Sequence, residues 1–251
     1  MGVHTLFRAT NAASYKAAST TILLPDVVAY RSNDVNYKNG AFFEVFHGFY
    51  KGNYGLDMGI LYDANGFRMF CGSLSGTAAS TWIDKDANGN FLTFNARPGD
   101  TIVLNTTLVN GYIKADVLKG GNQIKSISYY LNATAYNALA AGSFINREVT
   151  IAVNKNSAGA IEPYGNCYFR NCKVSKTTLT TASGSYVAMN TTNSNNINNG
   201  KLDDPVSGTS YDDEIITNIM DGNFVWDQAT ATFNKRDWPI DTIKTLPVQT
   251  S

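Results

Sequence analysis

Residues 54–72, YGLDMGILYDANGFRMFCG, decide the fold. The first half alternates between apolar positions and polar or small ones, which predicts a β-strand with one buried face. Asn65-Gly66 then supplies a two-residue turn, and an aromatic, apolar run follows, so this stretch is expected to be a hairpin. The face opposite the apolar one carries Asp57 and Asp63, which suits either a solvated edge or a binding groove.

The same pattern of short strands and turns continues on both sides of this hairpin. Turn signals recur every 8 to 12 residues, among them Asn88-Gly89 and Asn110-Gly111, as is typical of an all-β sandwich or barrel. The chain begins with a polar, weakly patterned lead, in which His4 is expected to be mobile. Further strands are expected in TTILLPD, AFFEVFHGFY, STWID, NFLTFNA, GDTIVLNTTLVNGYIKADVLKGG, QIKSISYYL, REVTIAVN, YFRNCKVS and SYVAMN.

Two segments favour helix over strand. In NATAYNALAAG, Asn132 is expected to cap a short helix and Gly142 to end it. The second candidate is SYDDEIITNIMDG, where Ser210 and Asp213 resemble a capping box.

The predicted organisation is one β-sandwich followed by two unlike segments. The sandwich is expected to span residues 1–187. Residues 188–210 are rich in Asn, Ser and Thr and predict a loop or linker. Residues 211–251 contain Trp226 and Trp238, and this C-terminal segment is expected to pack on the sandwich or on a partner.

Composition excludes several classes of partner. The chain has 20 Lys plus Arg and 20 Asp plus Glu, so its net charge is zero, and no basic stripe favours nucleic acid or an acidic membrane surface. No window approaches the length of a membrane span. Three cysteines, Cys71, Cys167 and Cys172, are an odd number and are expected to be small buried thiols, with a bridge from Cys71 to one of the others as the alternative.

The order of these signals resembles the concanavalin A-like jelly-roll sandwiches. Within them, the chain looks most similar to the glutamic peptidases (eqolisins) and related secreted bacterial proteins over residues 20–175. The resemblance rests on LDMGILYD, the Trp-bearing strand after it, ARPGDTIVLNTTLVNGYIKADV, a Gly-Gly turn, a helix and NREVTIAVN. It implies an all-β fold, a jelly-roll sandwich of two antiparallel sheets. Together with the short helix and the extended C-terminal segment indicated by the residues themselves, this is the predicted architecture.

The resemblance also implies where a catalytic pair would lie on the concave sheet. Glutamic peptidases use a Gln and a Glu, and these would fall at Asp57 and Asn154 of this chain. Neither residue type is kept, so peptidase activity by that mechanism is not expected. Asp57 and Asn154 are instead expected to hold a ligand, with Glu148 on the same face.

A glycan groove is the favoured interpretation of this face. Asp57 and Asp63 lie about 20 Å apart along one strand, so a catalytic partner for Asp57 would have to be Glu44 or Glu148 on a neighbouring strand. Aromatic rings stack on sugars, while carboxylates, amides and guanidinium groups bind hydroxyls. The residues expected to line the concave face are Asp57, Asn154, Glu148, Tyr50, Tyr54, Trp82 and Arg97.

Two other groups of residues resemble functional sites but also have a structural explanation. DKDANGN, residues 84–90, matches the first half of a calcium loop, with Asp84, Asp86, Asn88 and Asn90 as candidate ligands for Ca²⁺. A hairpin turn explains the same residues. His47 is expected to be a hydrogen-bonded histidine of an aromatic strand, because no nucleophile motif lies near it.

Together these observations predict a secreted or cell-surface, non-catalytic protein that binds a glycan or another surface partner through its concave sheet. One alternative is a hydrolase of polysaccharide or peptide that uses the same groove. The other is a structural module whose C-terminal segment docks on a partner.

Overall fold

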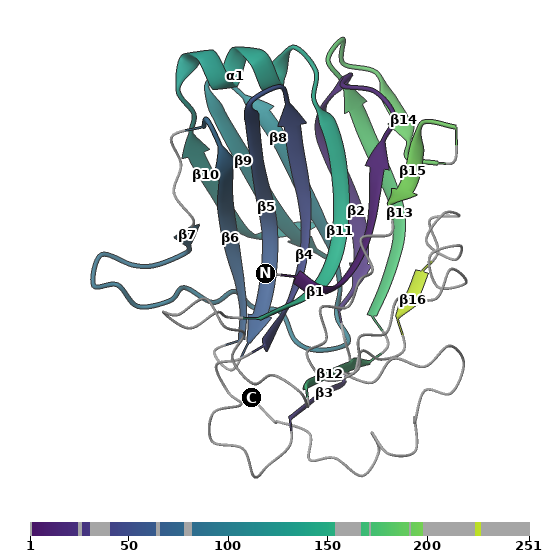
Figure 1. Ribbon diagram of the computed structural model, residues 1–251. Coiled ribbons are helices and arrows are strands. Elements are labelled where there is room, and N and C mark those ends of the chain that lie inside the picture. The colour runs from purple at the N-terminus through teal and green to yellow at the C-terminus, as the bar shows by residue number, and fades with distance from the viewer. Residues whose placement is uncertain are drawn as a thin grey trace.

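Within the residues that it describes, the computed structural model shows a sandwich of two antiparallel sheets with one helix across an end (Figure 1). The predicted fold class is therefore confirmed. The structure describes residues 2–24, 27–30, 41–63, 66–77, 82–153, 167–170, 172–190, 192–197 and 224–226. The second candidate helix, at residues 210–222, lies outside these ranges.

The first sheet, sheet A, contains the predicted hairpin strands of residues 54–63 and 66–75. Every neighbouring pair in it is antiparallel. In spatial order its strands are β15 (Ser194–Ile197), β1 (Gly2–Thr10), β11 (Phe144–Val153), β4 (Ala41–Lys51), β5 (Tyr54–Asp63), β6 (Gly66–Ser75) and β7 (Trp82–Ile83).

The second sheet, sheet B, packs face to face against the first. A separate pair, β3 (Val27–Tyr30) with β12 (Cys167–Arg170), lies beyond the sandwich (Figure 1). In spatial order the strands of sheet B are β10 (Asn122–Tyr130), β9 (Tyr112–Lys119), β8 (Thr101–Val109), β2 (Tyr15–Leu23), β13 (Cys172–Thr181) and β14 (Tyr186–Ala188), with β16 (Phe224–Trp226) also paired to β13.

Four strands, β1, β3, β15 and β16, lie where the sequence predicted no strand, and two of them pair with each other at one edge of sheet A. The weakly patterned lead forms β1, and His4 pairs with Ile151 of β11, so the expectation of a mobile start is wrong. Ser194–Ile197, inside the segment predicted to be a loop or linker, pairs with β1 as an edge strand. Both segments gain their order from a neighbouring strand distant in sequence, which a local pattern does not reveal.

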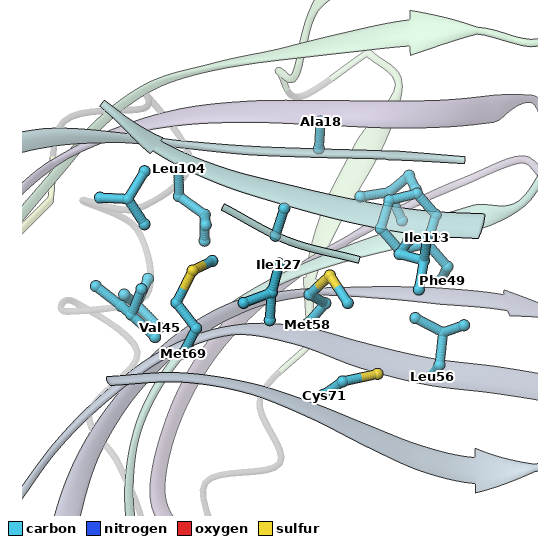
Figure 2. Packing of buried hydrophobic residues seen from close by; sticks show 14 of the residues in the cluster. Ala18, Val45, Phe49, Leu56, Met58, Met69, Cys71, Leu104, Ile113 and Ile127 are labelled. Carbon is cyan, nitrogen blue, oxygen red and sulfur yellow. The ribbon is translucent and has the colours of Figure 1, made fainter. Parts of the chain in front are cut away.

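Alternating side chains of the two sheets fill the space between them. Figure 2 shows Leu104 and Ile127 of sheet B facing Val45, Met58 and Met69 of sheet A. All of these side chains are less than 10% exposed. The core thus uses the apolar face that the alternation in β5 predicted.

A polar layer interrupts this apolar interior. The ring nitrogens of His47 hydrogen-bond with the hydroxyl groups of Thr20 (2.7 Å) and Thr106 (2.9 Å), which belong to the opposite sheet. Arg147 donates to Thr177 across the same gap at 3.0 Å. Burial, reinforced by the charge of Arg147, lowers the pKa of His47 to about 3, so the ring is neutral. His47 is therefore a hydrogen-bonded structural residue, as predicted.

Helix α1 (Ala133–Ala140) closes one end of the sandwich. The Asn132 side chain accepts a hydrogen bond from the Ala135 amide at 2.8 Å, which confirms the predicted N-cap. Gly142, just past the helix, has φ +127°, a conformation that suits glycine. Within the described residues, no helix is long and apolar enough to cross a membrane.

Candidate functional site

The candidate site lies on the face of sheet A that points away from sheet B, here called the outer face of sheet A. In β4, Val45 and Phe49 point into the core, so Glu44, Phe46, Gly48 and Tyr50 lie on the outer face. In β5 the same alternation puts Asp57, Gly59 and Leu61 on that face. The strand pairing then decides which of these residues are neighbours.

The pairing between strands aligns four residues of the outer face in one row across four neighbouring strands. Gly48 pairs with Asp57 on one side and with Asn146 on the other, and Asp57 pairs with Gly72. The row therefore reads Asn146, Gly48, Asp57, Gly72 across β11, β4, β5 and β6. An amide and a carboxylate stand at two of its positions, and glycines without side chains occupy the other two.

Tyr50 is the immediate partner of Asp57. Its phenol donates a hydrogen bond to the Asp57 carboxylate. Gly48 makes this possible, because a β-carbon there would lie 2.7 Å from both the Tyr50 hydroxyl and Asp57 Oδ1. The other side of Asp57 is different, since a β-carbon on Gly72 would meet no atom within 4 Å. Asp57 is thus held on one side and open on the other.

The environment of Asp57 raises its pKa. Burial raises it to about 6, while the hydrogen bond from Tyr50 acts in the opposite direction. The pKa of Tyr50 is raised well above its usual range by burial and by the charges of Asp57 and Glu148. Tyr50 therefore stays protonated and remains a donor, and Asp57 is mainly ionised at neutral pH.

Two further carboxyl groups share this face. Glu44 has a pKa of about 8, raised mainly by burial and also by the charge of Asp57, so it is mostly protonated at neutral pH. Glu148 lies on β11, where its neighbour across the strand pair is Phe46 of the same face. Both Glu44 and Glu148, which the sequence offered as partners of Asp57, thus lie on its side of the sheet.

A small apolar cluster adjoins the polar row. Phe46, Leu61 and Phe70 pack together on the outer face and are each less than 10% exposed. The rings of Phe46 and Phe70 meet edge to face, with centroids 5.6 Å apart, across the bare backbone of Gly59. This apolar cluster covers the sheet surface beside the polar row that contains Asp57.

We expect the substitution Tyr50→Phe to raise the pKa of Asp57 above about 6. The phenol hydrogen bond stabilises the ionised carboxylate, so its loss favours the protonated form. NMR titration of the Asp57 carboxyl carbon measures this directly. Tyr54→Phe is the matched control, because Tyr54 packs against the core between the sheets. An unchanged Asp57 pKa in Tyr50→Phe would contradict the assigned contact.

The other residues predicted to line this face are dispersed. Tyr54 packs against the interior, and Arg97 lies in the exposed turn that leads into β8 of sheet B. Trp82 pairs through its backbone with Cys71 at the sheet edge, and its side chain is outside the described set. Asn154 lies outside the described residues. Of the predicted set, the structure brings together Asp57, Glu148 and Tyr50.

The candidate calcium ligands have other partners. Asp86 accepts hydrogen bonds from the amides of Asn88 (2.8 Å) and Asn90 (2.9 Å) and from the Asn90 side chain (3.0 Å), which is the hairpin-turn alternative. Asp84 is 6% exposed and forms an ion pair with Lys125 of the opposite sheet. Among the described residues, no three His, Cys, Asp or Glu side chains gather in a way that could hold a metal ion.

Cys71 is a free thiol packed in the core, where burial raises its pKa to about 12. The alternative of a disulfide from Cys71 is therefore wrong. A thiol of such high pKa is a poor nucleophile, and it lies on the interior face rather than beside Asp57.

Sequence reasoning missed Gly48, Asn146 and Phe144 as parts of the site. Phe144 is 41% exposed and pairs with Tyr50, so its ring stands next to the Tyr50–Asp57 pair. Side chains alternate between the two faces of a strand, so Phe144, Asn146 and Glu148 must share one face. The sequence alone was sufficient to show this. Their position next to β4 follows only from strand pairing.

Comparisons with known proteins give matches to solved structures alone. No family model matches the chain, and no curated protein matches it. Among solved structures, Scytalido-glutamic peptidase is 14% identical with a TM-score of 0.39, over 68% of this chain and 79% of that one. SCP-B, of the eqolisin peptidases, is 15% identical with a TM-score of 0.39, over 73% and 82%.

A third match is the CBM2 module of the evolved Dit of Lactobacillus casei BL23 phage J-1. It is 7% identical with a TM-score of 0.35, over 66% of this chain and 59% of that one. Two of these three structures belong to the family named from the sequence. At these scores the likeness carries no argument about activity, so function must be argued from the site.

Proposed function

We propose that the outer face of sheet A binds a glycan. The observation that supports this most is the Tyr50–Asp57 pair, a carboxylate held in place by a phenol within a row that also contains Asn146. A fixed carboxylate accepts hydrogen bonds from sugar hydroxyls, and an amide both donates and accepts them. The exposed Phe144 ring beside Tyr50 offers a surface on which a sugar ring can stack.

The glycines of the row support this proposal sterically. Open space lies over Gly72, directly next to Asp57 on the neighbouring strand. A sugar unit seated there would reach the free side of the carboxylate while Tyr50 holds the other side. Binding at a prearranged polar group loses less entropy than binding at a mobile one.

The substitution Asp57→Asn tests this function. It keeps the shape of the side chain but removes the charge, and hydrogen bonds to charged groups contribute about 1.5–3 kcal/mol. We expect the affinity for the bound glycan to fall at least about tenfold. The measurement is a glycan array with the full chain, followed by calorimetry on the best ligand.

Asp86→Asn is the control, since Asp86 is a carboxylate of a surface turn outside the site. Its binding should equal that of the unmodified protein. If the unmodified protein binds no glycan on the array, or Asp57→Asn binds as well as it, the proposal is wrong.

A hydrolase acting on polysaccharide or peptide is the second candidate, and one observation favours it. Glu44 is mostly protonated and Asp57 mostly ionised at neutral pH, although both lie on one sheet face. Carboxyl groups whose environments separate their pKa values are typical of acid and base pairs. Product release from polysaccharides, or from proteins at acid pH, that Glu44→Gln abolishes would support this candidate over simple binding.

A secreted or cell-surface location is part of the proposal. A glycan-binding role outside the cell agrees with the zero net charge of the chain. The structural-module alternative concerns residues 211–251, most of which lie outside the described ranges, and it stays a prediction.

A further inference from the structure

The opposite surface of the sandwich, the face of sheet B that points away from sheet A, has an unusual composition. It is here called the outer face of sheet B. Leu104, Ile113 and Leu179 point into the core, so their neighbours along each strand point outward. Many of these outward positions are serine, threonine or asparagine, and Val103 and Leu118 form an apolar pair among them.

Strand register aligns the outward residues into two rows that cross the whole sheet. The pairing connects all six strands from β10 to β14 without a gap in either row. The first row is Ser128, Lys114, Thr107, Ala17, Thr180 and Tyr186, and the second is Ser126, Asp116, Asn105, Ser19, Thr178 and Ala188.

The two rows are electrically neutral. Their only charged members, Lys114 and Asp116, form an ion pair with each other at 3.0 Å. The remaining polar members carry hydroxyl or amide groups. Such a surface offers a charged ligand no net attraction, but it can exchange many hydrogen bonds with a neutral, hydroxyl-rich one.

Exposed tyrosines lie near both edges of this face, with Tyr186 at the end of the first row and Tyr112 and Tyr130 in the row next to it. Tyr112 and Tyr130 are 42% and 64% exposed and form an edge-to-face pair with centroids 5.6 Å apart, at the β9–β10 edge. Tyr186 is 80% exposed on β14, at the other edge. Of the seven large apolar side chains that are exposed among the described residues, these three and Val109 lie on this face.

We propose that the outer face of sheet B is a second glycan-binding surface, on which a neutral polysaccharide chain lies across the strands. Six strands at about 4.8 Å spacing span roughly 24 Å, which gives room for several sugar units. The tyrosines at the two edges stack on sugar rings, and the hydroxyl and amide rows between them bind the sugar hydroxyls. This surface extends across six strands, whereas the Asp57 site lies on the opposite side of the sandwich.

The test uses the full chain and insoluble neutral polysaccharides, namely amorphous cellulose, chitin and an insoluble mixed-linkage β-glucan. The fraction of protein that sediments with each polymer is measured against protein concentration. We expect binding to at least one polymer, and we expect Tyr112→Ala/Tyr130→Ala to weaken it at least about tenfold. Tyr186→Ala should weaken it as well, through the other edge.

Three controls separate stacking from other effects. Tyr112→Phe/Tyr130→Phe keeps both rings and should retain most of the binding. Leu92→Ala changes an exposed apolar residue away from this face and should have no effect. Circular dichroism checks that each variant is folded.

The outcome is independent of the Asp57 site. In a chain that already carries Asp57→Asn, the Tyr112→Ala/Tyr130→Ala change should still weaken sedimentation with the polymers. If the unmodified protein binds none of the three polymers, or if the double alanine variant binds as strongly as it, the second surface is ruled out. Loss of polymer binding in Asp57→Asn alone would equally overturn the proposal, because it would place all binding on the outer face of sheet A.

Discussion

Replacing Gly59 by alanine is expected to lower the free energy of unfolding by about 3 kcal/mol. A β-carbon at this position would lie closer than 3.0 Å to the Val45 carbonyl oxygen and to the backbone of Phe46. These atoms belong to the neighbouring strand β4, so the clash can be relieved only by separating two strands in the middle of sheet A. Urea denaturation followed by fluorescence measures the loss.

Gly72→Ala is the matched control. Gly72 lies on the same sheet face, on the adjacent strand, but an added β-carbon there meets no atom within 4 Å. Its free energy of unfolding should stay within about 0.5 kcal/mol of the unmodified protein. Equal stabilities for the two variants would show that β4 and β5 are not packed as described.

Raising the pH from 6.5 to 8 is expected to destabilise the protein by about 1.5 kcal/mol, because of Glu44. Burial raises the pKa of Glu44 from 4.5 to about 8 in the folded protein, so in this window the folded state holds a proton that the unfolded state has released. A group of this kind stabilises the fold at low pH, and its contribution is lost as the pH rises toward the folded pKa. Denaturation midpoints measured between pH 6.5 and 8 give the dependence of stability on pH.

Glu44→Gln should remove this slope, because glutamine does not titrate. Below pH 6.5 a second group acts in the opposite sense. The unfolded chain takes up a proton on His47 near its ordinary pKa of 6.5, whereas the folded protein resists it down to about 3, so acid destabilises the fold. A stability that stays flat between pH 6.5 and 8 in the unmodified protein would contradict the buried position of Glu44.

The two predictions describe one feature of the outer face of sheet A. Glycines bring strands and side chains close together there, and carboxyl groups are held partly away from water. Both arrangements lower stability relative to an ordinary sheet surface, and proteins usually tolerate such features at functional sites. This is the physical reason for looking for a ligand at Asp57 before any other position.

Much of the fold follows from local pattern. The alternation of Leu56, Met58 and Ile60 identifies the buried face of β5, and all three are fully buried. Asn110 and Gly111 both have positive φ, as the predicted tight turn requires. The cap at Asn132 likewise depends only on residues within one helical turn of it.

The candidate site depended on information that local pattern does not contain. The alternation along β5 predicted the correct sheet face for Asp57. Tyr54 and Arg97 were predicted to share that face, but Tyr54 packs against the core and Arg97 lies in an exposed turn. Strand β1 went unrecognised because its pairing with β11, rather than its own composition, makes it a strand.

The amino-acid sequence by itself determined most of the strands among the described residues, the tight turn at Asn110-Gly111, helix α1 and which side of those strands is apolar. These properties depend on contacts within a few residues and on the two-residue period of a β-strand. Only the tertiary structure decided that Asn146, Gly48, Asp57 and Gly72 form one row, and that Tyr50 holds Asp57. Register between strands distant in sequence is selected by the packing of the whole sandwich, because a shift of one residue would turn every side chain of a strand to the other face.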